Sequence, residues 1–515
     1  MKMKKVSLKM GALLLIATSL FSCSKNESSN ISKPLTVIGQ AISDTILPQM
    51  DGNGNPIPLK GTMLAGKTYH IMSDVTINEG DTLYVQPGVN VLIHGDGKSP
   101  KTSPCFYVNG SLISSGTKTA PNWFTVFATA ATPKSNSSYH DDVVNDPAFA
   151  GYWGGFQCGP NANLLLLRWT HVEYTGGPWG DNAADYGAKP GDARFTISMD
   201  NTGATPGKLI VEDSWFYGAV DDGIRPQNVY MSIMRNTFEK MGATGGESTN
   251  IKNGVYGDMA YNLTYGIATN GLKTAGKDGK PCLVNIYNNT VVNCGFRQLK
   301  ATRNGSINTE TNAGGFIYNN IIVNCKSGLR ISYQSQKGKP SDTLNTAYGN
   351  NLTCIGRGTP MGGAEQFMIY IEPNQFTLKQ PTDFNGYNNG AIDPATGTNA
   401  GINNSNDSLK YDPKFVNYDV KAQSAGSSYR NYAIPAGADF HLKSGSMAIG
   451  SGVYKGGTGI NKYPAKPSAP LLSQYGFPMT LLVNNGSDEF SAHITPPNKD
   501  LGAFPTDGTG NQQTY

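Results

Sequence analysis

The stretch that decides the fold occurs twice in succession. IYNNTVVNCG runs from Ile286 to Gly295 and IYNNIIVNCK from Ile317 to Lys326, so equivalent residues lie 31 positions apart. Related segments, each with a polar residue between two short apolar runs, are centred on Asp213, Asn236, Asn262, Asn289, Asn320 and Asn351. The intervals between these residues are 23, 26, 27, 31 and 31 positions. Such a period is typical of a solenoid, in which each unit buries its apolar face against its neighbours.

Each unit reads as a strand, an Asn bend, a second strand and a Gly-containing turn. This order indicates one coil of a single-stranded right-handed parallel β-helix, an all-β fold, whereas the LxxLxL skeleton of leucine-rich repeats is absent. Equivalent residues of successive coils would stack about 4.8 Å apart, so each inward Asn can bond the next. Cys294 and Cys325, with Cys354 near the same place, are expected to fill one interior column, although a disulfide between two of them on different coils is the alternative.

The N-terminus has the features of an exported protein. Four Lys residues precede the apolar run GALLLIATSLF, which is too short to span a bilayer but has the length of a signal-peptide core. The run closes on LFSC, which resembles the lipobox of bacterial lipoproteins and implies a lipid anchor at Cys23. An ordinary secretory signal is the alternative. We therefore expect attachment to the outer membrane through the lipid alone, with exposure at the cell surface as one arrangement.

These features divide the chain into four segments. We expect a signal peptide over residues 1–22, a polar tether over 23–45, a parallel β-helix over 46–438 and C-terminal coils with a short cap over 439–515. Glu27 in the tether is similar to the acidic surface-export signal of Bacteroidota-type lipoproteins.

Charge and motif content exclude several functions. The four Lys residues of the signal account for the whole formal net charge of +4, so the remaining chain is neutral and has no basic field to attract nucleic acid. The six His residues are scattered, and no CxxC, P-loop or GxSxG motif occurs. We expect no cofactor and no metal site, although acidic residues of the 174–194 loop could hold Ca²⁺ through oxygen ligands.

Three segments near the C-terminus resemble a known family. They are DPKFVN (412–417), DFHLKSGSMAIGSG (439–452) and KDLGAFP (499–505), and their order resembles the terminal signature of bacterial right-handed β-helix repeat proteins with the pectate-lyase-like fold. Met447 and Gly450 stand where that signature has Pro and Asp, and a polar insertion over 418–437 separates two of its parts. The resemblance implies the fold but no activity, because lyases, hydrolases, epimerases and adhesins share it.

The first candidate site is VDDGIRP, which holds Asp221, Asp222 and Arg225. Adjacent acidic residues are loosely similar to the paired Asp of polygalacturonases, and a carboxylate with a nearby cation suits general acid–base chemistry on a glycan. The alternative is a turn that enters a strand, because Asp and Gly both favour turn geometry.

The second candidate is a group of cations, Arg297, Lys300 and Arg330, which follow the strands of the repeat. Arg297 follows Asn289 by eight residues, as Asp221 follows Asp213, so both are predicted to lie on one sheet. They would lie three coils apart, about 14 Å, which is too far to share one catalytic centre. The alternative is a solvated edge with scattered ion pairs.

The third candidate is the Gly-rich loop over residues 174–194, with Trp179, Asp181 and Tyr186. Exposed aromatic rings stack on sugars and carboxylates bond their hydroxyl groups, so the loop could form a binding wall. The alternative is a wide turn whose Trp packs back on the coil.

No convergent acid–base set is visible in the sequence. The leading interpretation is therefore a surface lipoprotein that binds an extracellular polysaccharide or a partner protein without catalysis. A lyase or polygalacturonase-like hydrolase that acts on an acidic glycan is the second interpretation, and a structural adhesin is the third.

Overall fold

The chain forms two compact units, residues 1–36 and 37–515, and the second holds nearly all described residues. The computed structural model describes residues 35–127, 143–277, 279–298, 305–325, 329–331, 341–342, 345–354, 369–370, 412–424, 431–454 and 490–515. Cys23 and Lys300 lie outside the described residues, and Arg330 is described by its backbone alone.

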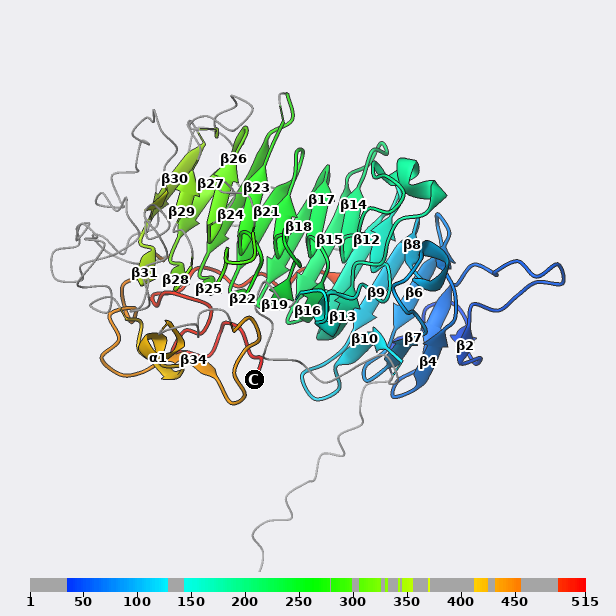
Figure 1. The fold of residues 1–515 in the computed structure, drawn as a ribbon, viewed down its shortest axis with the longest axis horizontal. Helices are drawn as coiled ribbons and strands as arrows, with labels where there is room; N and C mark the ends of the chain where they lie inside the picture. Colours follow the sequence, from blue (N-terminus) through cyan, green and yellow to red (C-terminus); the bar gives the residue numbers. More distant parts are fainter. Residues whose placement is uncertain are drawn as a thin grey trace, which may run out of the picture. The chain divides into compact units, whose positions relative to one another are not determined.

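Three long parallel sheets, to which each coil contributes in turn, form the unit (Figure 1). The first sheet contains, in spatial order, β1 (Ala41–Ile42), β3 (Gly61–Met63), β6 (Thr82–Val85), β9 (Ser111–Ser115), β12 (Leu164–Arg168), β15 (Gly207–Glu212), β18 (Val229–Met234), β21 (Tyr256–Ala260), β24 (Cys282–Tyr287), β27 (Ala313–Tyr318) and β30 (Thr346–Gly349). The second contains β2 (Ile46–Leu47), β4 (Thr68–Ile71), β7 (Asn90–Ile93), β10 (Asn122–Val126), β13 (Thr170–Thr175), β16 (Trp215–Ala219), β19 (Thr237–Met241), β22 (Leu263–Tyr265), β25 (Thr290–Val292), β28 (Ile321–Val323) and β31 (Leu352–Cys354).

The third sheet contains β5 (Val75–Ile77), β8 (Phe106–Val108), β11 (Phe156–Cys158), β14 (Ile197–Asp200), β17 (Ile224–Gln227), β20 (Thr249–Ile251), β23 (Leu272–Ala275), β26 (Ile307–Glu310), β29 (Leu329–Ile331) and β32 (Ile369–Tyr370). Single turns of 3-10 helix occur at η1 (Pro100–Thr102), η2 (Pro147–Phe149) and η3 (Asp181–Tyr186). From β3 onward, neighbours within each of these sheets are three strands apart along the chain and parallel, which confirms the predicted parallel β-helix. The first coil begins at β1, inside the segment that we expected to be tether.

An asparagine ladder holds successive coils together at the bend between the first two sheets. The Oδ1 atom of Asn320 accepts hydrogen bonds from the backbone N–H and the side-chain amide of Asn289, both at 2.9 Å. Asn320 in turn donates to Asn351 Oδ1 at 2.9 Å, and Asn262 donates to Asn289 in the same way. All these side chains are buried, so each bond satisfies a polar group that has no access to water. The predicted role of the repeated Asn is confirmed.

The prediction that Asp213 belongs to this ladder is wrong by one residue. Trp215 pairs with Thr237, so Ser214 is the equivalent of Asn236, and the Ser214 N–H donates to Asn236 Oδ1 at 2.9 Å. Asp213 instead takes the left-handed conformation before the ladder position, with φ of +52°. In later coils Asn288 and Asn319 take that conformation, because Asn tolerates positive φ better than most residues. The two consecutive Asn residues of the repeat therefore have different structural roles.

The cysteines are interior fillers. Cys105, Cys158, Cys282, Cys294, Cys325 and Cys354 are all free and buried. Cys294 and Cys325 occupy equivalent positions after β25 and β28, and each sulfur lies close to a strand carbonyl. Cys354 pairs with Val323 and lies in a different column. The expectation of an interior Cys column is met by Cys294 and Cys325, without a disulfide.

The C-terminal signature segments come together in space. β33 (Phe415–Asn417) and β34 (Asp439–Leu442) form an antiparallel pair, and α1 (Val420–Ser424) lies between them in the chain. We had placed the start of the C-terminal segment at residue 439. Because β33 pairs with β34, this segment already includes β33. Residues 490–515, which we call the C-terminal strap, run along the outside of the coils. Ser491 accepts a hydrogen bond from Arg168, and Asn498 accepts one from Asn319 on a later coil. The strap then returns toward earlier coils, where Gln513 donates to the carbonyl oxygen of Asp213.

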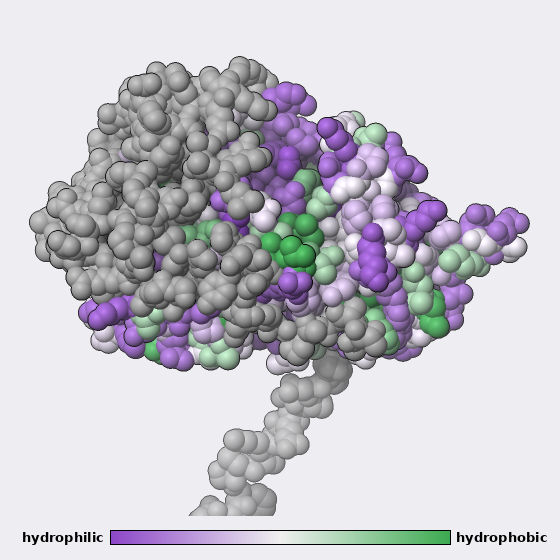
Figure 2. All heavy atoms as spheres, in the orientation of Figure 1, coloured by the Kyte–Doolittle hydropathy of each residue, from purple (hydrophilic) through white to green (hydrophobic). Residues whose placement is uncertain are grey.

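The described surface exposes few large apolar side chains. They are Leu35, Val37, Ile46, Met50, Ile57, Met72, Val144 and Val416. On the face drawn in Figure 2, small apolar areas near the centre and at the lower right lie among more hydrophilic residues. Among the described residues, no helix has the length and apolar character needed to cross a membrane.

Candidate functional site

Polar and charged side chains gather on the outer face of the third sheet. In β17 the burial alternates, with Ile224 and Pro226 inward and Arg225 and Gln227 outward, as expected for one buried face. The outward residues of four neighbouring coils, together with polar residues of the turns that precede three of these strands, form a group that we call the polar array. Its members are Asp222, Arg225, Gln227, Glu247, Asn250, Lys252, Asn270, Lys273, Asn308 and Glu310.

Asp222 is bonded to three other members of the array. Its Oδ2 atom accepts from Arg225 Nη1 at 3.1 Å and from Asn250 Nδ2 at 2.7 Å, and its Oδ1 atom accepts from the Glu247 backbone N–H at 2.9 Å. The Asp222 side chain is 2% exposed, whereas that of Arg225 is 36% exposed. The Arg225 guanidinium also lies over the ring of Phe195 at 4.6 Å. Arg225 is therefore a positioned cation with part of its surface open to solvent.

A second set of contacts continues the array toward β26. Lys273 Nζ lies 3.5 Å from Glu247 Oε1 and 3.0 Å from Glu310 Oε1. Asn270 donates to Glu247 Oε1 at 3.1 Å, and Asn308 donates to Glu310 Oε2 at 3.2 Å. Lys273 thus lies between two carboxyl groups, as Arg225 lies beside Asp222, so these two cations each have an opposite charge beside them.

The pKa values of two buried carboxyl groups of the array, those of Glu247 and Asp222, are shifted in opposite directions. Burial raises the pKa of Glu247, and the charge of Asp222 raises it further against the opposing effect of Lys273. Burial also acts against ionisation of Asp222, but hydrogen bonds from Glu247 and the Arg225 charge outweigh it and lower its pKa. Glu247 is therefore the proton donor within the pair, and Asp222 is the ionised partner at neutral pH. Asp221, half-buried beside them, has its pKa raised to about 7 by burial and by the Asp222 charge.

Lys252 differs from the other cations of the array. Burial lowers the pKa of its ammonium to about 8, and the charges of Arg225 and Lys273 add to that effect. In the described part of the chain, the Lys252 ammonium makes no hydrogen bond and no ion pair within contact distance. The pKa of Lys273 is instead raised, because Glu247 and Glu310 outweigh the cost of its burial. Lys252 is thus the array amine that most readily exists in the neutral, basic form near pH 8.

Two amide oxygens in the array have no donor. The Oδ1 atoms of Asn250 and Asn270 are buried and make no hydrogen bond among the described residues, although both amide nitrogens are used. Buried acceptors are normally satisfied, so these two oxygens are exceptions, and their burial keeps them out of reach of a ligand in this structure.

The structure separates Arg297 from Asp222. Arg297 is fully buried, and its guanidinium donates to the carbonyl oxygens of Met241, Gly242 and Ala243 at 2.7–3.1 Å. It also lies over the rings of Phe149 and Tyr432, at 4.9 and 4.2 Å. This environment is that of a structural cation at a chain bend, and it leaves no surface for a ligand. The expectation that Arg297 lines the same open sheet as Asp221 fails because its guanidinium is buried among these carbonyl oxygens and rings.

Arg330 does belong to the sheet that carries the array. Its backbone pairs with Asn308 in β26, so it occupies the next register position after Lys273 and Asn308. Sequence reasoning missed Glu247, Lys252, Lys273 and Glu310, the four ionisable groups that complete the array.

The 174–194 loop packs against the coils. Trp179 is 1% exposed, stacks on Tyr186 at 4.9 Å and lies beneath the Arg194 guanidinium at 4.8 Å. A buried indole cannot stack on a sugar at the surface, so Trp179 supports the loop. Asp181 begins η3 and is exposed. Among the described residues, no three His, Cys, Asp or Glu side chains are grouped to hold a metal ion.

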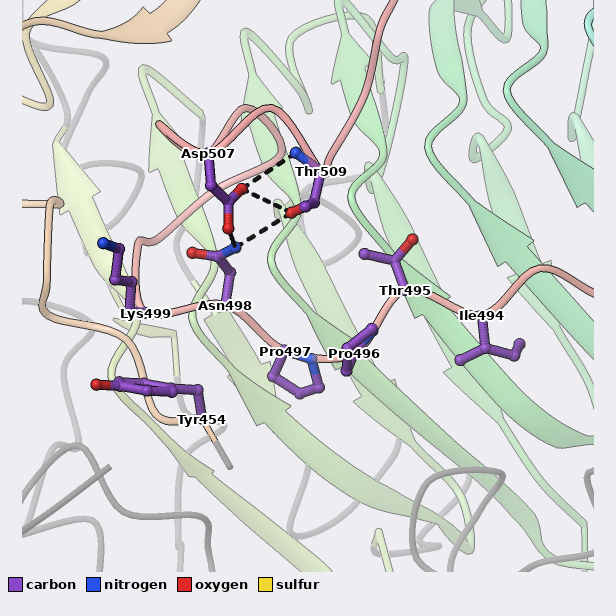
Figure 3. A pocket seen from close by; sticks show the side chains of 9 residues that line it. All are labelled: Tyr454, Ile494, Thr495, Pro496, Pro497, Asn498, Lys499, Asp507 and Thr509. Atoms are coloured by element: carbon purple, nitrogen blue, oxygen red, sulfur yellow. Dashed lines mark hydrogen bonds between the residues drawn. The ribbon is translucent and has the colours of Figure 1, made fainter. Parts of the chain in front are cut away.

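A cavity of about 590 Å³ lies apart from the array, against the C-terminal strap (Figure 3). Its lining residues are Tyr454, Ile494, Thr495, Pro496, Pro497, Asn498, Lys499, Asp507 and Thr509. The Asp507 carboxylate is already bonded to Asn498 at 2.6 Å and to Thr509 at 2.7 Å. The cavity therefore offers no acid–base pair comparable to the array.

The fold and the array define the chain as a parallel β-helix protein with an ionisable site on its third sheet. No family model matches the chain, and no curated protein matches it. Among solved structures, it is similar to a double-mutant form of the periplasmic alginate epimerase AlgG, with a TM-score of 0.31 and 10% sequence identity over 75% of this chain and 92% of that chain. A likeness of this size carries no argument about activity.

Proposed function

We propose that the chain is a polysaccharide lyase that acts on an acidic glycan at the polar array. The observation that carries this proposal is the juxtaposition of Lys252, an amine with a pKa lowered to about 8, and Arg225, a positioned and partly exposed cation. The sequence favoured a binding protein because no convergent acid–base set was visible. Six ionisable groups of the array, on four neighbouring coils, supply such a set.

Each step of an elimination has a candidate group. Arg225 binds and neutralises the carboxylate of a uronate residue, which acidifies the adjacent C–H bond. Neutral Lys252 takes that proton, and the C–H electron pair forms the new carbon–carbon double bond. The bond to the glycosidic oxygen breaks, and the oxygen keeps its electron pair and takes a proton from Asp221, whose pKa is raised to about 7.

Direct hydrolysis fits the array less well. A glycosidase needs its two carboxyl groups about 5–10 Å apart, on either side of the scissile bond. The Asp222 and Glu247 carboxyl groups are instead hydrogen-bonded to one another, and no sugar can enter between them. We therefore propose that Asp222 and Glu247 hold Arg225 in position and influence the pKa of Lys252.

The proposal also includes the location of the protein. The lipobox-like LFSC at Cys23 supports an exported lipoprotein, anchored in the outer membrane by lipid and able to meet extracellular polysaccharide.

A panel of acidic polysaccharides tests the activity. Purified protein is incubated with polygalacturonate, alginate, hyaluronate and chondroitin sulfate, with a neutral glucan as control. The expected result is ultraviolet absorbance from an unsaturated product with at least one acidic polymer and none with the neutral glucan. Binding to a polymer without any product would contradict the lyase and favour the non-catalytic glycan-binding protein.

The activity should depend on pH in a defined way. Lys252 must be neutral to accept a proton and its pKa is lowered to about 8, so the rate rises with pH toward that value. Asp221 must be protonated to donate, and its pKa is raised to about 7, so the rate falls above that value. We expect kcat/KM to be bell-shaped, with a maximum between these two values. In Asp221→Asn the overall rate falls and the alkaline limb disappears; an unchanged alkaline limb would show that Asp221 is not the acid.

A further inference from the structure

The outer face of the second sheet differs between its two ends. At the C-terminal end, outward residues of β22, β25 and β28 pack under β33 and β34 in one buried cluster, in which Leu263, Val292 and Val323 lie on the sheet and Phe415 and Phe440 lie above it. At the N-terminal end, the outward residues of β4, β7 and β10 alternate with buried ones and are all partly open to solvent. We call the outward side of β2, β4, β7 and β10 the N-terminal face.

Large exposed apolar side chains are concentrated at this end of the chain. Of the eight in the described part of the protein, six lie between residues 35 and 72. Two of them belong to the N-terminal face, since Ile46 pairs with the outward His70, and Met72 follows the inward Ile71 at the end of β4. Ile46 is 60% exposed and Met72 is 49% exposed. The face therefore presents apolar surface that the described chain does not cover.

The N-terminal face also lacks charged residues. No Asp, Glu, Lys or Arg occurs in β2, β4, β7 or β10, and the aromatic residues of the face are Trp123 and, directly after β10, Phe127. Phe127 stacks on His94 at 4.4 Å, and burial, with the His70 charge, lowers the pKa of His94, so this ring is neutral at pH 7. An uncharged face with exposed aliphatic residues beside aromatic rings suits the boundary between the headgroups and acyl chains of a membrane.

The chain enters the coils at the same end. Val37 follows Cys23 by 14 positions, and a fully extended chain of that length spans at most about 50 Å. β1 and Ile46 of β2 belong to the first coil, so a lipid on Cys23 would keep Ile46 close to the membrane surface. The last strand of the first sheet lies ten strand spacings, about 48 Å, further along the stack. The reach of the anchor therefore favours contact through the first coils.

We infer that the N-terminal face lies against the surface of the membrane that holds the lipid anchor. This inference rests on the proposed anchor at Cys23 and is independent of the proposed lyase chemistry. Ile46 and Met72 enter the boundary between headgroups and acyl chains, and Trp123 lies beside them at the level of the headgroups. The polar array is on the third sheet, so contact through the second sheet leaves it open to a polysaccharide.

Two matched probes test this orientation. Met72→Cys and Val416→Cys each place a thiol at a partly exposed position, 49% and 42% exposed, at opposite ends of the second sheet, whereas the six described cysteines are buried. The lipidated variants are labelled with a fluorophore and bound to phosphatidylcholine vesicles, either ordinary or brominated near the top of the acyl chains. We expect bromine to quench the probe at residue 72 several-fold more than the probe at residue 416. Ile46→Cys, at a 60% exposed position, replaces Met72→Cys if that variant does not fold, and the same quenching is expected.

The outcomes distinguish the orientation from the anchor. Equal fluorescence of the residue 72 probe in ordinary and brominated vesicles, with the protein retained on both, would overturn the inference and leave the anchor intact. This result is also expected if a second copy of the chain covers the face. Equal quenching at residues 72 and 416 would show that the contact is not confined to the first coils, and would overturn the inference as well. Failure of the wild-type protein to carry lipid at Cys23 and to remain on the vesicles would overturn the proposed anchor, and the inference with it.

Discussion

Replacement of Asn320 by Asp is expected to lower the free energy of unfolding by about 3–5 kcal/mol, since it leaves an unpaired charge in the interior. Asn320 is fully buried and donates to Ile286 O at 3.0 Å and to Asn351 Oδ1 at 2.9 Å. An Asp carboxylate can still accept from Asn289, but it would face these two oxygens without a proton to donate. The same loss would occur at each equivalent ladder position.

Urea unfolding at neutral pH measures this effect. Asn163→Asp serves as the matched control, because it makes the same chemical change at an exposed position and should alter stability by less than about 0.5 kcal/mol. At low pH the introduced carboxyl group becomes protonated and can donate one hydrogen bond, so the deficit of Asn320→Asp should shrink. A loss below about 1 kcal/mol at neutral pH would show that the ladder is not what holds the coils together.

Glu212→Ala is expected to cost about 3–5 kcal/mol, because it removes the partner of two buried cations. Glu212 is fully buried and accepts from Arg168 at 3.1 Å, from Ser232 at 3.1 Å and from the His493 N–H at 2.8 Å. Arg235 lies 3.6 Å from the same carboxylate. One side chain thus joins three neighbouring coils to the C-terminal strap.

The loss should be visible at the strap as well as in global stability. Arg168 and Arg235 also donate to the carbonyl oxygens of Ser491 and His493, so a change in their position releases the start of the strap. We expect thermal unfolding at a lower temperature and faster protease cleavage near residues 491–495. Glu212→Gln keeps two acceptor lone pairs and should lie between the wild type and Glu212→Ala. Protease resistance in Glu212→Ala equal to that of the wild type would contradict this role.

The repeat predicted the fold because its regularity is imposed by the ladder itself. Asn289 and Asn320 must stack, so their spacing in the sequence is the length of a coil. The error at Asp213 has a physical origin, since Asp and Asn both suit the left-handed bend position beside the ladder. Only the strand pairing distinguishes the bend residue from the ladder residue.

The site was predicted only in part because its residues do not recur at a fixed spacing. Asp222 and Arg225 stand in one visible turn, but Lys252, Lys273 and Glu310 come from later coils whose lengths differ. Their strands, TNI, LKTA and INTE, place a polar side chain between apolar or Thr residues, and alignment of the coils by the ladder would have brought these outward positions together. The prediction for Arg297 was wrong because this residue follows the repeat closely, yet its side chain is buried against carbonyl oxygens and the rings of Phe149 and Tyr432.

The most direct test of the proposed chemistry is the turnover number of Lys252→Met on the acidic polysaccharide that the panel identifies. Met keeps the length and apolar stem of Lys but cannot accept a proton, so kcat should fall by at least about 100-fold, the usual effect of a lost general base. Lys208→Met, on the first sheet, is the matched control and should retain wild-type kcat. Wild-type kcat in a folded Lys252→Met protein would contradict the account of the polar array as a catalytic site.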